Sequence, residues 1–246
     1  TAGGTFGLSP TLELPSTRPR HHERTYDSSW KPRTLAKPDV TSSRLPPHKT
    51  GGHGSDIYGA RRLTLATLVQ RAFEHSGIPW FLDAGTLLGA HREGVQIPHD
   101  DDFDTAVYLP SFEEKDLVEL NALIAQRLPD PYQVRIVTSY ARKLEIFDPA
   151  SEVFELPPQY LGADFHTVTV DVQVMTDASD GVVYLHDMLD HVRVPRNAIV
   201  PTGEITLEGH LFECPHDVVR FLEAQYGYLG VEAVYDPKSR KYIKER

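Results

Sequence analysis

The chain of 246 residues lacks the features that mark several protein classes. A single cysteine, Cys214, excludes an intrachain disulfide and any cysteine-rich zinc site. No apolar run approaches the roughly 18 residues that a membrane helix needs, so we expect no membrane span in the given chain. The first residue is threonine rather than methionine, which is compatible with the removal of an upstream signal or anchor.

Positive charge is also scarce, and it is unevenly distributed. The formal net charge is -10, yet residues 1–62 hold ten Lys/Arg against five Asp/Glu, so the remaining 184 residues carry fifteen basic and thirty acidic groups. An acidic body repels a phosphate backbone, and we therefore expect no general nucleic-acid binding. A small phosphorylated substrate remains compatible with this charge, because a bound metal ion reverses the local field.

The chain divides near residue 55 by composition. Residues 1–50 contain seven of the nineteen prolines, many Ser/Thr and no apolar periodicity, so they cannot bury enough apolar surface to offset their ordering entropy. We expect residues 1–55 to be a largely irregular linker, stem or surface-wrapping arm. Residues 56–246 are expected to form one catalytic or binding domain.

Helical and strand patterns alternate along that second part. Periodicity and capping signals predict helices at 56–76 and 215–227, a helix opened at residue 111 by a Ser111–Glu114 capping box, and a short helix at 86–94. The strands are expected at 79–85, 103–108, 133–139, 141–148 and 166–175. This mixture predicts an α+β (α/β) fold in which helices flank a mixed sheet.

The strongest local feature is the run HDDDFD at 99–104, in which four of six residues are aspartates. In a strand, residues two apart point to the same face, so Asp102 and Asp104 are expected to project together. Paired carboxylates suit Mg²⁺ or Mn²⁺. A solvated acidic loop is the alternative. An EF-hand is excluded, because its sixth and twelfth positions would be Thr105 and Ser111 instead of Gly and Glu.

A further carboxylate, Asp171, stands among valines in the predicted strand 166–175. A charge there is costly unless it is paired or metal-bound. It could pair with Arg142 or Lys143, or cap a helix. Together with the D-x-D pair it would complete a three-carboxylate site, the layout used for two-metal phosphoryl transfer.

A small-residue turn precedes the acidic run. Gly85 permits close approach of a ligand to the backbone, and Thr86 with the amides after it could hold a phosphate at a helix N-terminus. Alone, a Gly-Thr pair is usually only a turn. Its position shortly before the D-x-D strand favours the phosphate-binding interpretation.

With these motifs together, the segment FLDAGTLLGAHREGVQIPHDDDFDTAV (81–107) resembles the signature of the LicD family, which includes fukutin and fukutin-related protein. The segment around Asp171 and the tail from Pro195 to Gly227 are similar to later parts of the family pattern, so the resemblance covers roughly residues 60–230. It implies a nucleotidyltransferase-like fold.

The resemblance also implies a metal-dependent phosphotransferase. Such an enzyme moves a phospho-alcohol, phosphocholine-like or ribitol-phosphate-like, from a CDP-activated donor to a glycan or polyol hydroxyl. By this resemblance Asp102 and Asp104 would bind Mg²⁺ or Mn²⁺, and Asp171 would bind a second ion or act as general base. Gly85 and Thr86 would hold a donor phosphate.

Further residues are implied in supporting roles. Arg92, Arg142 and Lys143 are candidates to bind phosphate and offset charge on the leaving group. Asp100 and Asp101 are expected to support the metal ligands or to join them.

Two other functions are compatible with the same residues. A nucleotidyltransferase would transfer the NMP and release pyrophosphate, and a non-catalytic relative would bind glycans only.

The net-basic, proline-rich arm is typical of the stem of a Golgi enzyme whose anchor has been removed. A bacterial cytoplasmic protein is the alternative.

Overall fold

The computed structural model describes residues 58–98, 100, 102–154, 165–230 and 232–245. All of them belong to the compact unit Thr41–Arg246. The expected arm at 1–55 and Asp101 lie outside the described residues, so the arm stays a prediction. Within the described ranges, no helix is both long enough and apolar enough to cross a bilayer.

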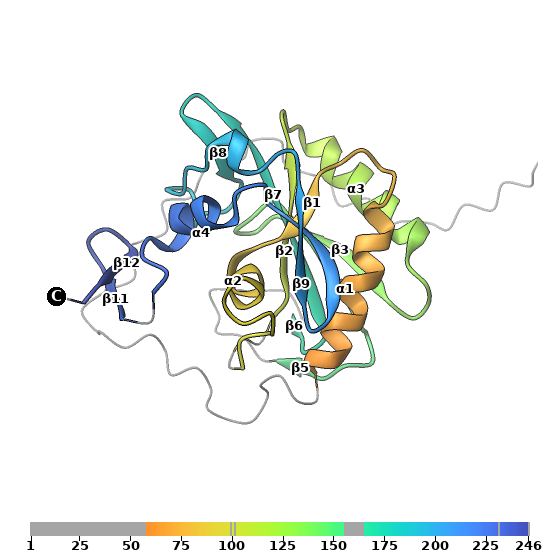
Figure 1. The fold of residues 1–246 in the computed structure, drawn as a ribbon. Helices are drawn as coiled ribbons and strands as arrows, with labels where there is room; N and C mark the ends of the chain where they lie inside the picture. Colours follow the sequence, from red (N-terminus) through yellow and green to blue (C-terminus); the bar gives the residue numbers. More distant parts are fainter. Residues whose placement is uncertain (1–57, 99, 101, 155–164, 231, 246) are drawn as a thin grey trace, which may run out of the picture. The chain divides into compact units, whose positions relative to one another are not determined.

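A mixed sheet of six strands forms the centre of this unit (Figure 1). The strand order is β1-β2-β7-β4-β3, with β8 added to β7. Its members are β1 (Trp80–Leu82), β2 (Asp104–Leu109), β3 (Gln133–Val137), β4 (Lys143–Phe147), β7 (Thr169–Ala178) and β8 (Gly181–Tyr184). Strands β2 and β7 run parallel, and the other pairs are antiparallel. The predicted mixed sheet is confirmed.

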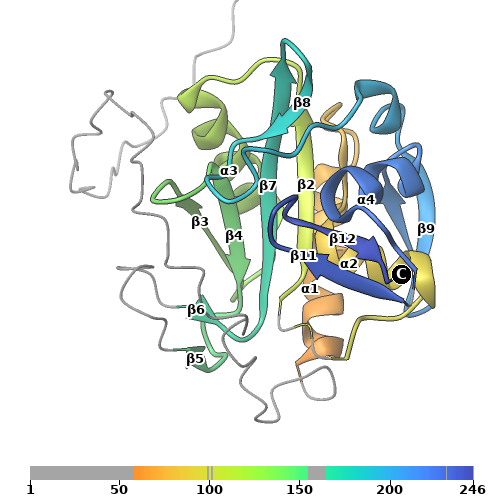
Figure 2. The same ribbon diagram turned by 90° about the vertical axis from the view of Figure 1, so that its left-hand side faces the viewer.

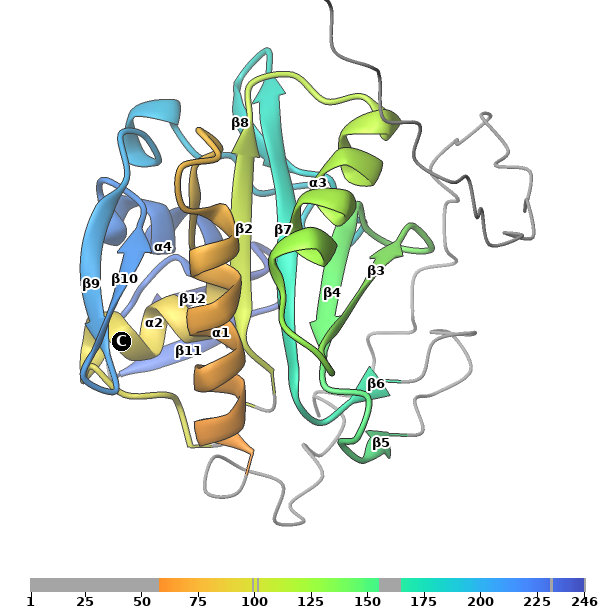
Figure 3. The ribbon, with the colours of Figure 1, turned by 90° about the vertical axis from the view of Figure 1, so that its right-hand side faces the viewer.

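Four α-helices flank this sheet in the part of the chain that the structure describes. They are α1 (Gly59–Phe73), α2 (Ala84–Arg92), α3 (Glu114–Arg127) and α4 (Val218–Tyr226). Helices α1 and α3 lie across one face of the sheet (Figure 3), whereas α2 and α4 lie on the other side (Figure 2). Both sides of the central strands are therefore covered.

Strict alternation along β7 separates an apolar face from a polar one. Val170, Val172 and Val174 are at most 1% exposed and belong to the apolar core. Asp171 and Gln173 alternate with them and therefore point to the opposite face. The sheet thus packs its valines toward α1 and α3 and presents polar side chains on the side of α2.

The capping box of α3 differs from the predicted one. Glu113, instead of Ser111, is the N-cap, and its backbone N–H donates to the Asp116 carboxylate at 2.7 Å. The helix consequently begins at Glu114, and its N-cap lies two residues after the predicted one. Acidic residues at both ends of the box satisfy the same two N–H groups that a Ser/Glu pair would satisfy.

Three small two-stranded sheets complete the described structure, and the periodicity analysis did not predict them. They are β5 (Val153–Phe154) with β6 (Phe165–His166), β9 (Gly203–Leu207) with β10 (His210–Cys214), and β11 (Ala233–Asp236) with β12 (Lys241–Lys244). Most of these strands are short and expose many of their residues, so their hydrophobic alternation is weak.

Candidate active site

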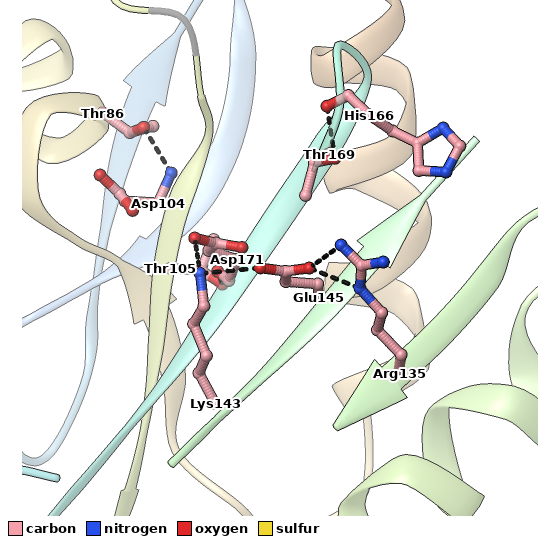
Figure 4. Close-up of polar contacts among 9 residues, drawn as sticks. All are labelled: Thr86, Asp104, Thr105, Arg135, Lys143, Glu145, His166, Thr169 and Asp171. Atoms are coloured by element: carbon pink, nitrogen blue, oxygen red, sulfur yellow. Dashed lines mark hydrogen bonds and ion pairs between the residues drawn. The ribbon is translucent and has the colours of Figure 1, made fainter. Parts of the chain in front are cut away.

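The parallel pairing of β2 and β7 places two of the three predicted carboxylates side by side. Asp104 and Asp171 are register partners (Figure 4). The buried Thr105 hydroxyl donates to the Asp171 carbonyl oxygen at 2.6 Å and accepts from Trp80 Nε1 at 3.2 Å. These bonds lie on the core side of β2, so they secure the register without using either carboxylate.

Several other acidic groups act on Asp104. Burial raises the pKa of the Asp104 carboxyl well above its usual value, and the charges of Asp102, Asp171, Asp83 and Asp100 raise it further. Asp102 is exposed in the bend before β2, so it approaches from outside the strand. The three predicted carboxylates thus belong to one concentration of negative charge.

Asp171 has a cationic partner at one oxygen. Lys143 Nζ lies 2.5 Å from Asp171 Oδ2 and 3.1 Å from Glu145 Oε1. Burial raises the pKa of the Asp171 carboxyl to about 6, although Lys143 opposes this shift. Burial alone would lower the pKa of Lys143, but Asp171 and Glu145 outweigh it and raise that pKa. The ammonium therefore stays charged.

The other oxygen of Asp171, Oδ1, is buried and has no hydrogen-bond partner within the described residues. A buried carboxylate oxygen without a partner is costly and calls for a ligand. This orphaned atom lies on the strand next to Asp104.

The N-terminus of α2 adjoins this cluster. The Thr86 hydroxyl accepts from the Asp104 backbone N–H at 2.9 Å, which ties the first turn of α2 to the start of β2. A Cβ added to Gly85 would lie 2.3 Å from Asp100 Oδ2, so only glycine lets this carboxylate approach the helix backbone. With the Thr86 side chain engaged in this way, any anion here would be bound by backbone N–H groups of the first turn.

Asp83 is the N-cap of α2 and connects it to two distant elements. Its Oδ1 accepts from Ala84 N, Tyr184 Oη and Gln225 Nε2, each at 2.7 Å. Asp83 is 1% exposed, and burial raises its pKa. Strand β8 and helix α4 thereby hold the helix terminus that faces Asp104.

Two of the predicted phosphate-binding cations have other partners. Arg92 Nη2 donates to the carbonyl oxygen of Leu229 at 3.0 Å. Arg142 Nε donates to Glu114 Oε1 of α3 at 2.6 Å, on the face of the sheet opposite the carboxylates. The structure brings Lys143 to the aspartates, but it does not bring Arg142 there.

The fit to a divalent cation rests on donor chemistry. Asp102, Asp104 and Asp171 offer hard carboxylate oxygens of the kind that Mg²⁺ and Mn²⁺ prefer, and one buried oxygen has no partner. Among the residues that the structure describes, however, no three His, Cys, Asp or Glu side chains already meet as a complete ligand set. The chemistry of these residues fits such an ion, and Asp102 is the most exposed of the three carboxylates.

Sequence reasoning missed three groups that build this site. Glu145 alternates with apolar residues on β4, so the charged position inside an apolar strand was a usable signal. Asp83 stands two residues before Gly85 of the Gly-Thr turn, at the position where an N-cap is expected. Arg62, fully buried on α1, donates to the carbonyl oxygens of Thr167 and Asp100 at 2.9 and 3.3 Å, and no local pattern indicates this contact.

Comparison with known families identifies the family of this domain. Residues 77–217 match the family model described as LicD/FKTN/FKRP, nucleotidyltransferase domain. The match covers more than half of the chain and includes the Gly-Thr turn and all three predicted carboxylates. It confirms the resemblance predicted from the 81–107 signature. No curated protein matches the chain.

Proposed function

Because the chain belongs to the LicD family of nucleotidyltransferase domains, we propose that it is a metal-dependent phosphotransferase. It moves a phospho-alcohol from a CDP-activated donor to a glycan or polyol hydroxyl. Family membership supports the coarser statement, a transferase of phosphorus-containing groups. The donor, the acceptor and the ion are part of the proposal.

One structural observation is the main support for this proposal. Asp104 and Asp171 stand in register on parallel strands, beside the N-terminus of α2, and one buried oxygen of Asp171 lacks a partner. Leaving a carboxylate oxygen buried without a partner is costly. A ligand that carries positive charge is the simplest group to satisfy it.

Different residues of the chain would have different roles in the reaction. Asp102, Asp104 and Asp171 would hold Mg²⁺ or Mn²⁺, which supplies charge neutralisation for a diphosphate when bound. The first-turn N–H groups of Gly85 and Thr86 would bind an anionic oxygen of the donor. In the reaction the acceptor oxygen would form a bond to the alcohol-bearing phosphorus, the phosphoanhydride bond to CMP would break, and the proton of the acceptor hydroxyl would pass to a base, either Asp171 or water.

A donor screen tests the proposal. The full chain is incubated with Mn²⁺, a polyol or glycan acceptor, and either CDP-choline or CDP-ribitol, and CMP is quantified. We expect Asp104→Asn to abolish CMP release while the circular dichroism spectrum is retained. Turnover that survives in both Asp102→Asn and Asp104→Asn would contradict the metal-site assignment.

Two further measurements distinguish the proposed phosphotransferase from the alternative functions. Pyrophosphate release from CTP in the presence of a phosphorylated polyol would instead indicate nucleotidyl transfer. A thermal shift with glycan, without any shift from Mn²⁺ plus CDP, would indicate a binding protein.

A further inference from the structure

We propose that Lys143 is a positioning residue that, together with Glu145, orients Asp171 so that its Oδ1 faces the divalent cation. This inference rests on the proposed function, because it assigns a task to residues beside the proposed metal site. It replaces the expectation that Lys143 contacts a phosphate.

The argument begins with a row of charged side chains across the sheet. Arg135 is the register partner of Glu145, Glu145 of Asp171, and Asp171 of Asp104. All four therefore point to the same face of four adjacent strands (Figure 4). Arg135 Nε donates to Glu145 Oε2 at 2.6 Å, so Glu145 is itself held from the outer strand.

Lys143 completes this row from the next position on the same face. It is 3% exposed, and its Nζ lies between Asp171 Oδ2 and Glu145 Oε1. The Tyr140 ring lies 5.2 Å from the same ammonium. An ammonium with two anionic partners and an aromatic neighbour, and almost no solvent access, is poorly placed to follow a substrate phosphate.

This contact settles the orientation of the Asp171 carboxylate. With Oδ2 held by Lys143, the carboxylate can turn little about its last torsion, and Oδ1 becomes the oxygen that is left for another ligand. A ligand that is held in place loses less freedom when it coordinates an ion. The positive charge of Lys143 also opposes the binding of a cation next to it.

Removal of the Lys143 charge should therefore strengthen Mn²⁺ binding, whereas loss of the Asp171 orientation should slow turnover. Lys143→Met keeps most of the apolar stem but removes the charge and frees Oδ2. We expect the Kd for Mn²⁺, measured by calorimetry on the full chain, to fall by about threefold or more, because a repelling charge is lost. At saturating Mn²⁺ we expect kcat for CMP release to fall roughly tenfold, because the ligand is no longer oriented.

If Lys143 had only a structural role, Lys143→Met would lower the stability of the fold and leave Mn²⁺ binding unchanged or weaker. Glu145→Gln is the second variant and covers the case in which Lys143→Met fails to fold. Removal of a negative charge there should weaken Mn²⁺ binding about twofold or more and also lower kcat. Lys115→Met, on the surface of α3, makes the same charge change as the first variant and should alter neither value.

The outcomes separate this inference from the proposed function. Tighter Mn²⁺ binding with slower turnover in Lys143→Met supports it, and so does weaker binding in Glu145→Gln. Unchanged or weaker Mn²⁺ binding in Lys143→Met, wild-type kcat in that variant, or unchanged binding in Glu145→Gln overturns it and leaves the metal site standing. A wild-type chain that binds no Mn²⁺ overturns the proposed function as well.

Discussion

The N-cap of α2 offers the sharpest test of how the site is held together. In Asp83→Ala, the buried donors Tyr184 Oη and Gln225 Nε2 lose their shared acceptor. Each such loss costs about 1–2 kcal/mol, with the lower value for Gln225 because its Nε2 also donates to Tyr184 Oη. The lost cap of α2 adds about 1 kcal/mol. Removal of a buried carboxyl whose pKa is raised by burial offsets part of this loss. We therefore expect a net loss of about 3 kcal/mol.

Urea unfolding of the full chain, followed by circular dichroism, measures this loss. With m near 2 kcal/mol/M, the midpoint should fall by about 1.5 M. Asp83→Asn is the matched control. It retains an acceptor oxygen in the same place, so it should lose less than about 1.5 kcal/mol. A loss below about 1 kcal/mol in Asp83→Ala, or an equal loss in both variants, would refute the reasoning.

Three further predictions concern other parts of the molecule. Burial, with a smaller contribution from Lys143, lowers the pKa of His186 to about 4 from 6.5. The unfolded state thus binds more protons between these values, and wild type should lose up to about 3 kcal/mol relative to His186→Asn as pH falls from 6.5 toward 4, measured by urea unfolding at each pH. Burial raises the pKa of the Cys214 thiol to about 11, so Ellman's reagent at pH 8 should react only after unfolding, and rapid reaction of the folded chain would contradict the buried placement. Gly227 ends α4 with φ 79°, and an added Cβ would lie 2.6 Å from the Tyr242 carbonyl oxygen. Gly227→Ala should therefore cost about 2 kcal/mol or more in thermal or urea unfolding, and a neutral effect would contradict the strain.

The central elements of the fold could be predicted because their signals are local and strong. The valine alternation around Asp171 indicated a strand, and the apolar spacing before Gly77 indicated α1. The ends of elements were less accurate. The D-x-D strand begins only at Asp104, so Asp102 lies in the preceding bend, because that bend turns the chain from the loop into the sheet.

The site could be predicted in part, since its motif residues are close in sequence but their partners are not. The Thr86 hydroxyl accepts a hydrogen bond from the backbone N–H of Asp104 across 18 residues, and the family signature contains both residues. By contrast, Gln225 reaches Asp83 across 142 residues. Only the packing of α4 brings them together, and no single-sequence pattern encodes such a contact.

The apolar face of β7 determines which face of the sheet carries the carboxylates. Burial of Val170, Val172 and Val174 contributes roughly 1.5 kcal/mol each. A shift of β7 by one residue would turn these valines toward the carboxylates and bury Asp171 against α1 and α3. Both consequences are unfavourable, so the register that pairs Asp171 with Asp104 is the stable one. The mutual repulsion of the two acids is thus opposed by packing on the other side of the sheet, which lets the chain keep them together before any cation binds.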